Sequence, residues 1–198
     1  MNTSRLDRRR TAFRLGSLLA LAALAPVLTL PVAGSLQAAG PPQLARLPPA
    51  VVAATGDLKR IGFGTMRWFG LHVYDVALWA RGTQWEPDDV HALDILYGRD
   101  LAGKALAESS ITEMKRVGFT DEAQHARWLA AMIRVFPNVG RGDRLIGVYL
   151  KGGGAAFFSQ ERALGTIDDP AFATAFFAIW LDPKTREPQL RARLLGKT

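Results

Sequence analysis

The chain has 198 residues, with 25 basic and 18 acidic side chains that give a formal net charge of +7, and it contains no cysteine. The length suits one domain with a substantial core, and the absence of cysteine excludes disulfides and thiolate sites. Residues 1–38 hold five of the basic side chains and one of the acidic ones, so the remainder carries only +3. That remainder shows no basic stripe of the kind that binds nucleic acid.

The first 38 residues have the layout of a secretory signal peptide. A basic start precedes an apolar run over residues 15–36, and small residues follow at Ala38 and Ala39. We expect cleavage near Ala38, with Ser35 as the alternative position. This predicts a periplasmic protein whose membrane contact is made only by its signal peptide.

Two alternatives concern the same segment. An uncleaved anchor helix is one, because the apolar run approaches the length that spans a bilayer, although Pro26 and Pro31 disfavour such a helix. Twin-arginine export is the other, since the paired arginines are followed by Ala12 and Phe13, and ordinary Sec export fits at least as well.

The next segment, residues 39–49, is rich in proline and is expected to be an extended, mobile leader to a domain over residues 50–198. Residues 51–54 and 58–63 are interpreted as short strands around a turn. Residues 67–80, rich in aromatic and branched side chains, are interpreted as one long strand.

The middle of the chain predicts a strand over residues 92–97 and then two helices. The first covers residues 105–116 and ends at Gly118. The second begins after Thr120 as N-cap and stops before Pro137. Its apolar side chains fall three and four residues apart and predict one buried stripe: Trp128, Leu129, Met132, Ile133 and Phe136.

The last third predicts strands over residues 144–150, 155–159 and 164–167, with a hairpin turn at 151–154. A helix is predicted from Pro170, because proline suits the first helical position. Strands therefore cluster, two helices follow, and the pattern repeats. This order favours an α+β fold, an antiparallel sheet with helices packed on one side.

Functional information is concentrated in residues 61–81 and 176–196. In the first stretch Arg67 follows Gly62 and Gly64, whose spacing is not that of a nucleotide-binding loop. An arginine fork in an apolar cavity would hold a carboxylate or a phenolate oxygen. The alternative is a structural ion pair with Asp75.

His72 and Tyr74 are also candidates, because side chains alternate along a strand and these two are predicted to share a face. They could form a proton-handling pair. The alternative is that each bonds to backbone or water, and a bulge near Gly70 would reset the alternation. The residues predicted to share this face are Trp68, His72, Tyr74, Val76 and Leu78.

Other common chemistries lack support. The three histidines, His72, His91 and His125, show no metal-ligand spacing, so no metal is expected. No Gly-x-Ser-x-Gly elbow is present, and no cofactor is expected.

Short motifs lie at residues 64–67, 73–79, 136–137, 142–143, 165–168, 176–183 and 194–196. Taken in their order and spacing, these motifs resemble the chalcone isomerase superfamily, specifically its bacterial chalcone isomerase-like branch. The resemblance implies an open-faced β-sandwich, a large antiparallel sheet covered by helices, with a cleft between them.

The resemblance also assigns roles. Arg67 stands where the plant isomerases hold the reacting phenolate, and Tyr74 where they use a threonine. Leu106 and Glu113 stand where they use a tyrosine and an asparagine. Since a leucine cannot position a catalytic water and a glutamate repels a phenolate, plant-type isomerisation is not expected.

Some superfamily members bind fatty acids in this cleft, with the arginine on the carboxylate. The resemblance therefore implies an exported protein that binds a hydrophobic, anionic ligand such as a fatty acid. One alternative is an isomerase, of intramolecular lyase type, acting on a phenolic or enone-type substrate through Arg67, Tyr74 and His72. Another is an interaction partner in an envelope complex, with a vestigial cleft. The expected ligand-binding residues are Arg67, Tyr74, Trp68, Leu106 and Glu113.

Overall fold

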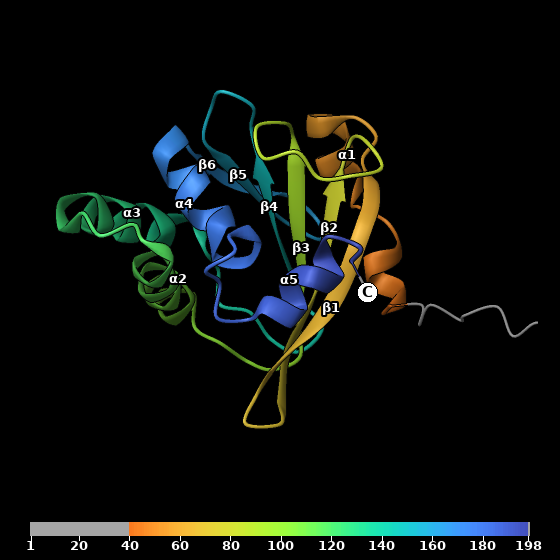
Figure 1. Ribbon diagram of the computed structural model, residues 1–198, viewed down its shortest axis with the longest axis horizontal. Coiled ribbons are helices and arrows are strands. Elements are labelled where there is room, and N and C mark those ends of the chain that lie inside the picture. The colour runs from red at the N-terminus through yellow and green to blue at the C-terminus, as the bar shows by residue number, and fades with distance from the viewer. Residues whose placement is uncertain (1–39, 198) are drawn as a thin grey trace, which may run out of the picture. The chain divides into compact units, whose positions relative to one another are not determined.

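The computed structural model describes residues 40–197, so the expected signal peptide and its cleavage near Ala38 lie outside the described residues. Six strands form one antiparallel sheet whose spatial order follows the chain (Figure 1). The sheet is open, with β1 and β6 at its edges, and the predicted α+β class is confirmed. The strands are β1 Lys59–Trp68, β2 Leu71–Ala80, β3 His91–Tyr97, β4 Arg144–Tyr149, β5 Ala155–Ser159 and β6 Ala163–Ile167.

One face of the sheet is covered by four helices. Three are long, α2 Gly103–Val117, α3 Glu122–Val135 and α4 Pro170–Leu181, and one is short, α5 Pro188–Leu194. Aspartates begin two of them: Asp121 accepts from two backbone amides of α3, and Asp169 from two of α4. Such caps satisfy amides that have no partner inside the helix. Asp121, not the predicted Thr120, is therefore the N-cap of α3.

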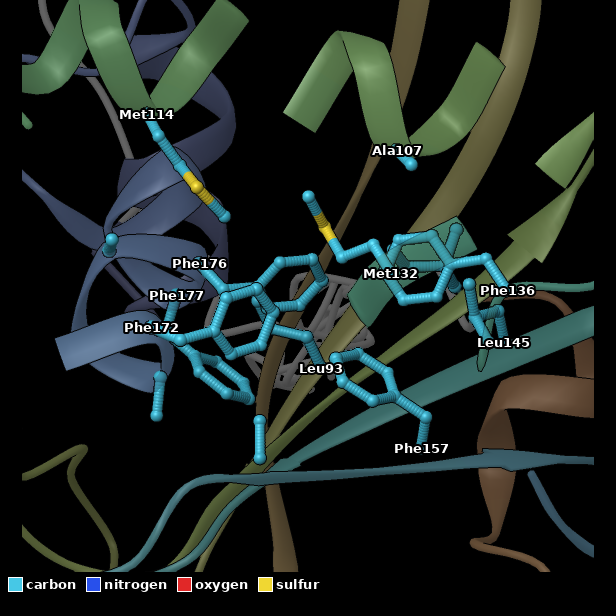
Figure 2. Packing of buried hydrophobic residues seen from close by; sticks show 14 of the residues in the cluster. Leu93, Ala107, Met114, Met132, Phe136, Leu145, Phe157, Phe172, Phe176 and Phe177 are labelled. Carbon is cyan, nitrogen blue, oxygen red and sulfur yellow. The ribbon is translucent and has the colours of Figure 1, made fainter. Parts of the chain in front are cut away.

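Alternate residues of the strands point to the two faces. Val76 and Leu78 pack against the helices, whereas Ala77 and Trp79 pack on the opposite side. The helix side holds a cluster rich in phenylalanine, and Figure 2 shows Met114 of α2 on the same side of the sheet as these rings. Burying each such aromatic contributes about 1.5–3 kcal/mol, so this cluster is the main source of stability. The phenylalanines are Phe136, Phe157, Phe172, Phe176 and Phe177.

The opposite face is covered by the segment expected to be an extended leader. A 3₁₀ helix, η1 (Pro42–Ala45), and α1 (Pro49–Thr55) contribute fully buried Leu44 and Val51 to the second cluster. The predicted strand over residues 51–54 is thus wrong. Pro49 at the start of α1 presets the helical backbone, and this outweighs the strand preference of the two valines.

A buried ion pair lies on this second face. Asp94 of β3 and Arg144 of β4 are opposite charges with almost no exposed surface, and Arg144 Nε donates to Asp94 Oδ1 at 3.0 Å. Arg144 Nη2 also donates to the carbonyl of Arg46 at 3.0 Å. The pair therefore ties the N-terminal segment to the sheet.

Helices α2 and α3 form a single excursion between β3 and β4. Its two ends meet where Leu101 pairs with Val139 in an isolated bridge. Beside it, Gly103 N donates to Asn138 Oδ1 at 2.9 Å. A side chain at Gly103 would collide with the carbonyl of Phe136, so glycine is needed for this close approach. We call the meeting point the clasp.

The predicted long strand over residues 67–80 is interrupted at its start. Phe69 and Gly70 have φ angles of 47° and 79° and form a tight turn that makes β1 and β2 a hairpin. Two positive φ angles are what a type I′ hairpin turn requires. A register shift follows, because Met66 pairs with Tyr74 but Arg67 pairs with His72, which leaves Val73 as the extra residue of a bulge.

Candidate functional site

A cavity of about 400 Å³ lies between the sheet and helices α2 and α4. Ligand pockets of small molecules commonly have 300–1,000 Å³, so the cavity is large enough for a ligand. Its body is apolar and is formed by Leu93, Ile95, Leu145, Phe157 and Phe176. These side chains come from β3, β4, β5 and α4, so the cavity and the main core share the same walls.

Two phenol groups, Tyr74 and Tyr97, face each other inside this apolar body, with ring centroids 6.2 Å apart. The Tyr74 hydroxyl accepts a hydrogen bond from Trp180 Nε1 at 2.9 Å. Burial raises the pKa of Tyr74 to about 12 and raises that of Tyr97 as well. Both phenols are therefore protonated at neutral pH and can donate to an acceptor in the cavity.

The polar groups around the cavity are centred on Arg186, in the loop after α4. Its Nη1 donates to Glu113 Oε1 at 2.9 Å, while Arg116 Nε contacts Glu113 Oε2 at 3.2 Å. The Arg186 guanidinium also lies 4.5 Å from the ring centroid of Trp68, within cation–π range. A guanidinium has five N–H groups, so Arg186 keeps donors beyond the one given to Glu113.

Four predicted residues are brought together here. Trp68, Tyr74, Leu106 and Glu113 all line the cavity, from β1, β2 and α2. Their contact with a ligand stays a prediction. The Glu113 carboxylate lies between two arginines, so its repulsion of an anion is weaker than the sequence alone implied.

Arg67 does not lie in the cavity, and its expected placement there is wrong. The side chain is exposed at the hairpin turn, where Nη1 donates to the Gly70 carbonyl at 3.2 Å. The alternative ion pair with Asp75 is also wrong, because Asp75 bonds to Thr65 and His72 instead. Met66 and Trp68, the residues on either side of Arg67, both line the cavity, so alternation along β1 directs the Arg67 side chain away from it.

His72 and Tyr74 do not form the predicted pair. His72 Nε2 lies 3.1 Å from Asp75 Oδ2, and Asp75 Oδ1 accepts from the Thr65 hydroxyl at 2.5 Å. Tyr74 instead points into the cavity. The bulge at Val73 is the physical reason, because one extra residue reverses the alternation between the two positions.

Sequence reasoning missed three groups of the site: Tyr97, Trp180 and Arg186. Tyr97 follows Leu93 and Ile95 at two-residue spacing on the helix-covered face of β3, so the period of the strand could have found it. Trp180 and Arg186 lie within residues 176–196, which the sequence marks as informative. Arg186 follows the end of α4, where no periodic pattern says which way a side chain points.

Two properties of the described residues bear on other functions. Within residues 40–197, no three metal-ligating side chains gather at one place. None of the helices in that range combines the length and the apolar character needed to cross a bilayer.

The open antiparallel sheet, its helical cover and the apolar cavity between them define an α+β protein with a ligand-sized internal site. The model of the chalcone isomerase-like family matches residues 43–196, so this chain belongs to that family. The predicted superfamily is thereby confirmed, whereas the bacterial branch stays a prediction.

Among solved structures, the fold is similar to the crystal structure of a fatty-acid binding protein of Arabidopsis thaliana, with a TM-score of 0.53 and 10% identity. The match covers 71% of this chain and 88% of that chain, and at this identity it shows the fold alone. No curated protein matches the sequence.

Proposed function

We propose that this protein binds a small hydrophobic ligand with a weakly acidic end, such as a fatty acid, in the cavity between the sheet and α2. The observation that carries the proposal is an apolar cavity of about 400 Å³ with an arginine, Arg186, and two protonated phenols, Tyr74 and Tyr97, in its wall. The similar plant protein, which binds fatty acids, supports it.

The energetics favour an apolar chain inside the cavity. Each methylene that leaves water contributes about 0.8 kcal/mol. A hydrogen bond to a charged group adds about 1.5–3 kcal/mol, so the chain supplies most of the affinity and the polar end sets the orientation.

Arg186 is the cation that we assign to the acidic end, in place of Arg67. It lines the cavity, and stacking on Trp68 positions its guanidinium. Tyr74 and Tyr97 offer neutral donors deeper inside. A carboxylate near Arg186 would keep its charge close to solvent, where the desolvation cost is smallest.

Plant-type isomerase chemistry is not part of the proposal. Leu106 has no polar group with which to hold a water, and both oxygens of Glu113 are engaged by arginines. We further propose that the protein is exported to the periplasm, on the strength of the basic and apolar pattern of residues 1–38.

Native mass spectrometry of gently purified protein, followed by titration with a saturated fatty acid, tests the binding proposal. We expect a co-purified lipid mass and a rise in Tm, because a ligand at 100 times its Kd stabilises the folded state by about 2.7 kcal/mol. Leu106→Trp should obstruct the cavity with a bulky ring and weaken both results. Leu129→Trp, on the neighbouring helix and away from the cavity, is the matched control.

Absence of any bound lipid together with an unchanged Tm in the wild-type protein would reject the binding proposal. Loss of chalcone absorbance at catalytic protein concentration would instead favour the isomerase alternative. That activity should be sensitive to Tyr74→Phe, since Tyr74 is the buried phenol held by Trp180.

A further inference from the structure

The turn of the β1–β2 hairpin exposes an unusual amount of apolar surface. Among residues 40–197, four large hydrophobic side chains are exposed, and three lie here: Trp68 at 41%, Phe69 at 89% and Leu71 at 62%. Arg67 is exposed beside them. We call residues 67–71 the hairpin tip.

The backbone of the hairpin tip has a conformation that is unfavourable for Phe69. Phe69, with φ of 47°, is the one non-glycine residue of the described chain in the left-handed region. Residues with bulky side chains rarely adopt this conformation, whereas asparagine and glycine adopt it readily. The Phe69 ring contacts the edge of the Trp68 ring but stays 89% exposed, so burial does not offset the unfavourable backbone of a phenylalanine at this position.

The tip also projects beyond the rest of the sheet. Pairing between β2 and β3 begins at Tyr74 and Tyr97, and the last backbone bond on this side runs from Gly98 N to Val73 O, so the tip itself has no partner in β3. Figure 1 shows the hairpin extending past the ends of the neighbouring strands. A turn that projects in this way can insert into a lipid layer without disturbing the pairing of the sheet.

The tip and the cavity share Trp68, which lines the cavity and is exposed at 41%. Arg186 stacks on the same ring. Arg99, also exposed, lines the cavity from the end of β3. Apolar side chains at the tip are therefore accompanied by three arginines, Arg67, Arg99 and Arg186.

We propose that the hairpin tip inserts into the surface of an anionic lipid bilayer, with Phe69 and Leu71 below the headgroups and Arg67 on the lipid phosphates. Aromatic side chains favour the membrane–water interface, and arginines near it are attracted to anionic lipid. This goes beyond ligand binding in the cavity and adds a second membrane contact to the one expected from the signal peptide. It would bring the Trp68 side of the cavity to the bilayer.

A protein partner fits the tip less well. Three large side chains cover about 500 Å² at most, whereas a stable protein–protein interface buries about 800 Å² on each partner. Insertion into lipid has no such requirement, because each apolar side chain gains by leaving water independently of its neighbours.

The absence of cysteine allows a single label to report on the tip. Leu71→Cys would carry an environment-sensitive fluorophore, in purified protein whose N-terminus is the same in every variant. With vesicles of phosphatidylcholine and phosphatidylglycerol we expect a blue shift and quenching by lipid-borne quenchers. Gln84→Cys, in the exposed loop at the other end of β2, should show neither.

Phe69→Asn in the labelled protein is the decisive variant. Asparagine suits the left-handed backbone, so Tm should hold or rise, while vesicle affinity falls about tenfold because an aromatic side chain no longer leaves water. Arg67→Gln should weaken binding about fivefold on anionic vesicles and leave binding to phosphatidylcholine alone unchanged. Fatty-acid affinity should be unaffected by either change, which separates this proposal from ligand binding.

An unshifted Leu71→Cys label on anionic vesicles would overturn the proposal and leave a protein partner as the explanation of the tip. An equal response of the Gln84→Cys label would overturn it too, because the protein would then adsorb without a preferred side. Undiminished vesicle binding by Phe69→Asn would have the same consequence.

Discussion

Trp180 of α4 donates its indole N–H to the hydroxyl of Tyr74 on β2, with 2.9 Å between the nitrogen and the oxygen. This bond joins the helical cover to the sheet across the cavity. Because the Tyr74 oxygen accepts from the indole, its own proton is free to point at a ligand. One interaction thus serves both the stability of the fold and the polarity of the site.

Tyr74→Phe should lower the free energy of unfolding by about 1–2 kcal/mol, because the Trp180 N–H loses its acceptor in a half-buried place. Urea denaturation would measure the change. Tyr97→Phe is the matched control, since within residues 40–197 its hydroxyl has no hydrogen-bond partner. It should leave stability within about 0.5 kcal/mol of wild type. Equal losses in the two variants would show that the indole bond is not the source.

Arg186→Gln should weaken the binding of a fatty acid about tenfold, as expected for the loss of one charged hydrogen bond. The corresponding alcohol should bind as before, because it carries no charge. Calorimetric titration of both ligands would test this. Arg116→Gln breaks the other ion pair of Glu113 without touching the cavity and should change neither affinity. If Arg186→Gln retained full affinity for the acid, the carboxylate would have to lie elsewhere.

His91 should make the fold sensitive to acid. Burial lowers the pKa of His91 from 6.5 to about 4, and its Nε2 has no partner among the described residues. Its Nδ1 bonds to the carbonyl of Asp89, and Tyr149 stacks on the ring, so the neutral form suits the site. The unfolded chain binds the proton more readily, and stability is therefore present above pH 6.5 and lost as pH falls toward 4.

The expected loss from this group is about 3 kcal/mol across that range. Urea denaturation at a series of pH values would measure it. His91→Gln keeps a donor for the Asp89 carbonyl but cannot be protonated, so its stability should fall less over the same range. A pH dependence identical to that of wild type would assign the effect to other groups.

The contributions of Asp94 and Arg144 to the free energy of unfolding should be strongly coupled. Replacing Asp94 by Leu alone leaves a buried guanidinium unpaired and should cost about 3–5 kcal/mol, and Arg144→Met alone should do the same to the carboxylate. The double variant should recover most of that loss, because an apolar pair of similar volume avoids the desolvation of two charges. A double-mutant cycle from denaturant unfolding would give the coupling, and simple additivity would contradict it.

Much of the fold could be predicted because the main signals are local. Strand β3, the strands of the last third and helix α4 follow from alternation, glycine turns and the proline after Asp169. The covering of the second face by residues 42–55 could not be predicted, because a segment that combines prolines with valines has no clear helical pattern. Their packing on Ala77 and Trp79 is decided by tertiary contact rather than by local preference.

The site was predicted in part for a related reason. Trp68, Tyr74, Leu106 and Glu113 line the cavity as the family resemblance implied, but Arg67 does not. A hairpin turn is normally marked by Asn-Gly or Asp-Gly, and here the sequence has Phe-Gly, so the turn was hidden inside an apparent strand. The bulge that follows turned His72 away from Tyr74, and no pattern of residues announces a bulge at a valine.

The clasp between Leu101 and Val139 marks where the inserted helices α2 and α3 leave and rejoin the sheet. All five ladders of the sheet join neighbouring strands, and none depends on α2 or α3. The two helices are thus an insertion between β3 and β4 that covers the sheet without adding a strand to it. Exchanging the side chain of Leu106 or Ser109, which line the cavity, would change which ligand the protein accepts, while Ile111 and Met114 hold α2 in the core.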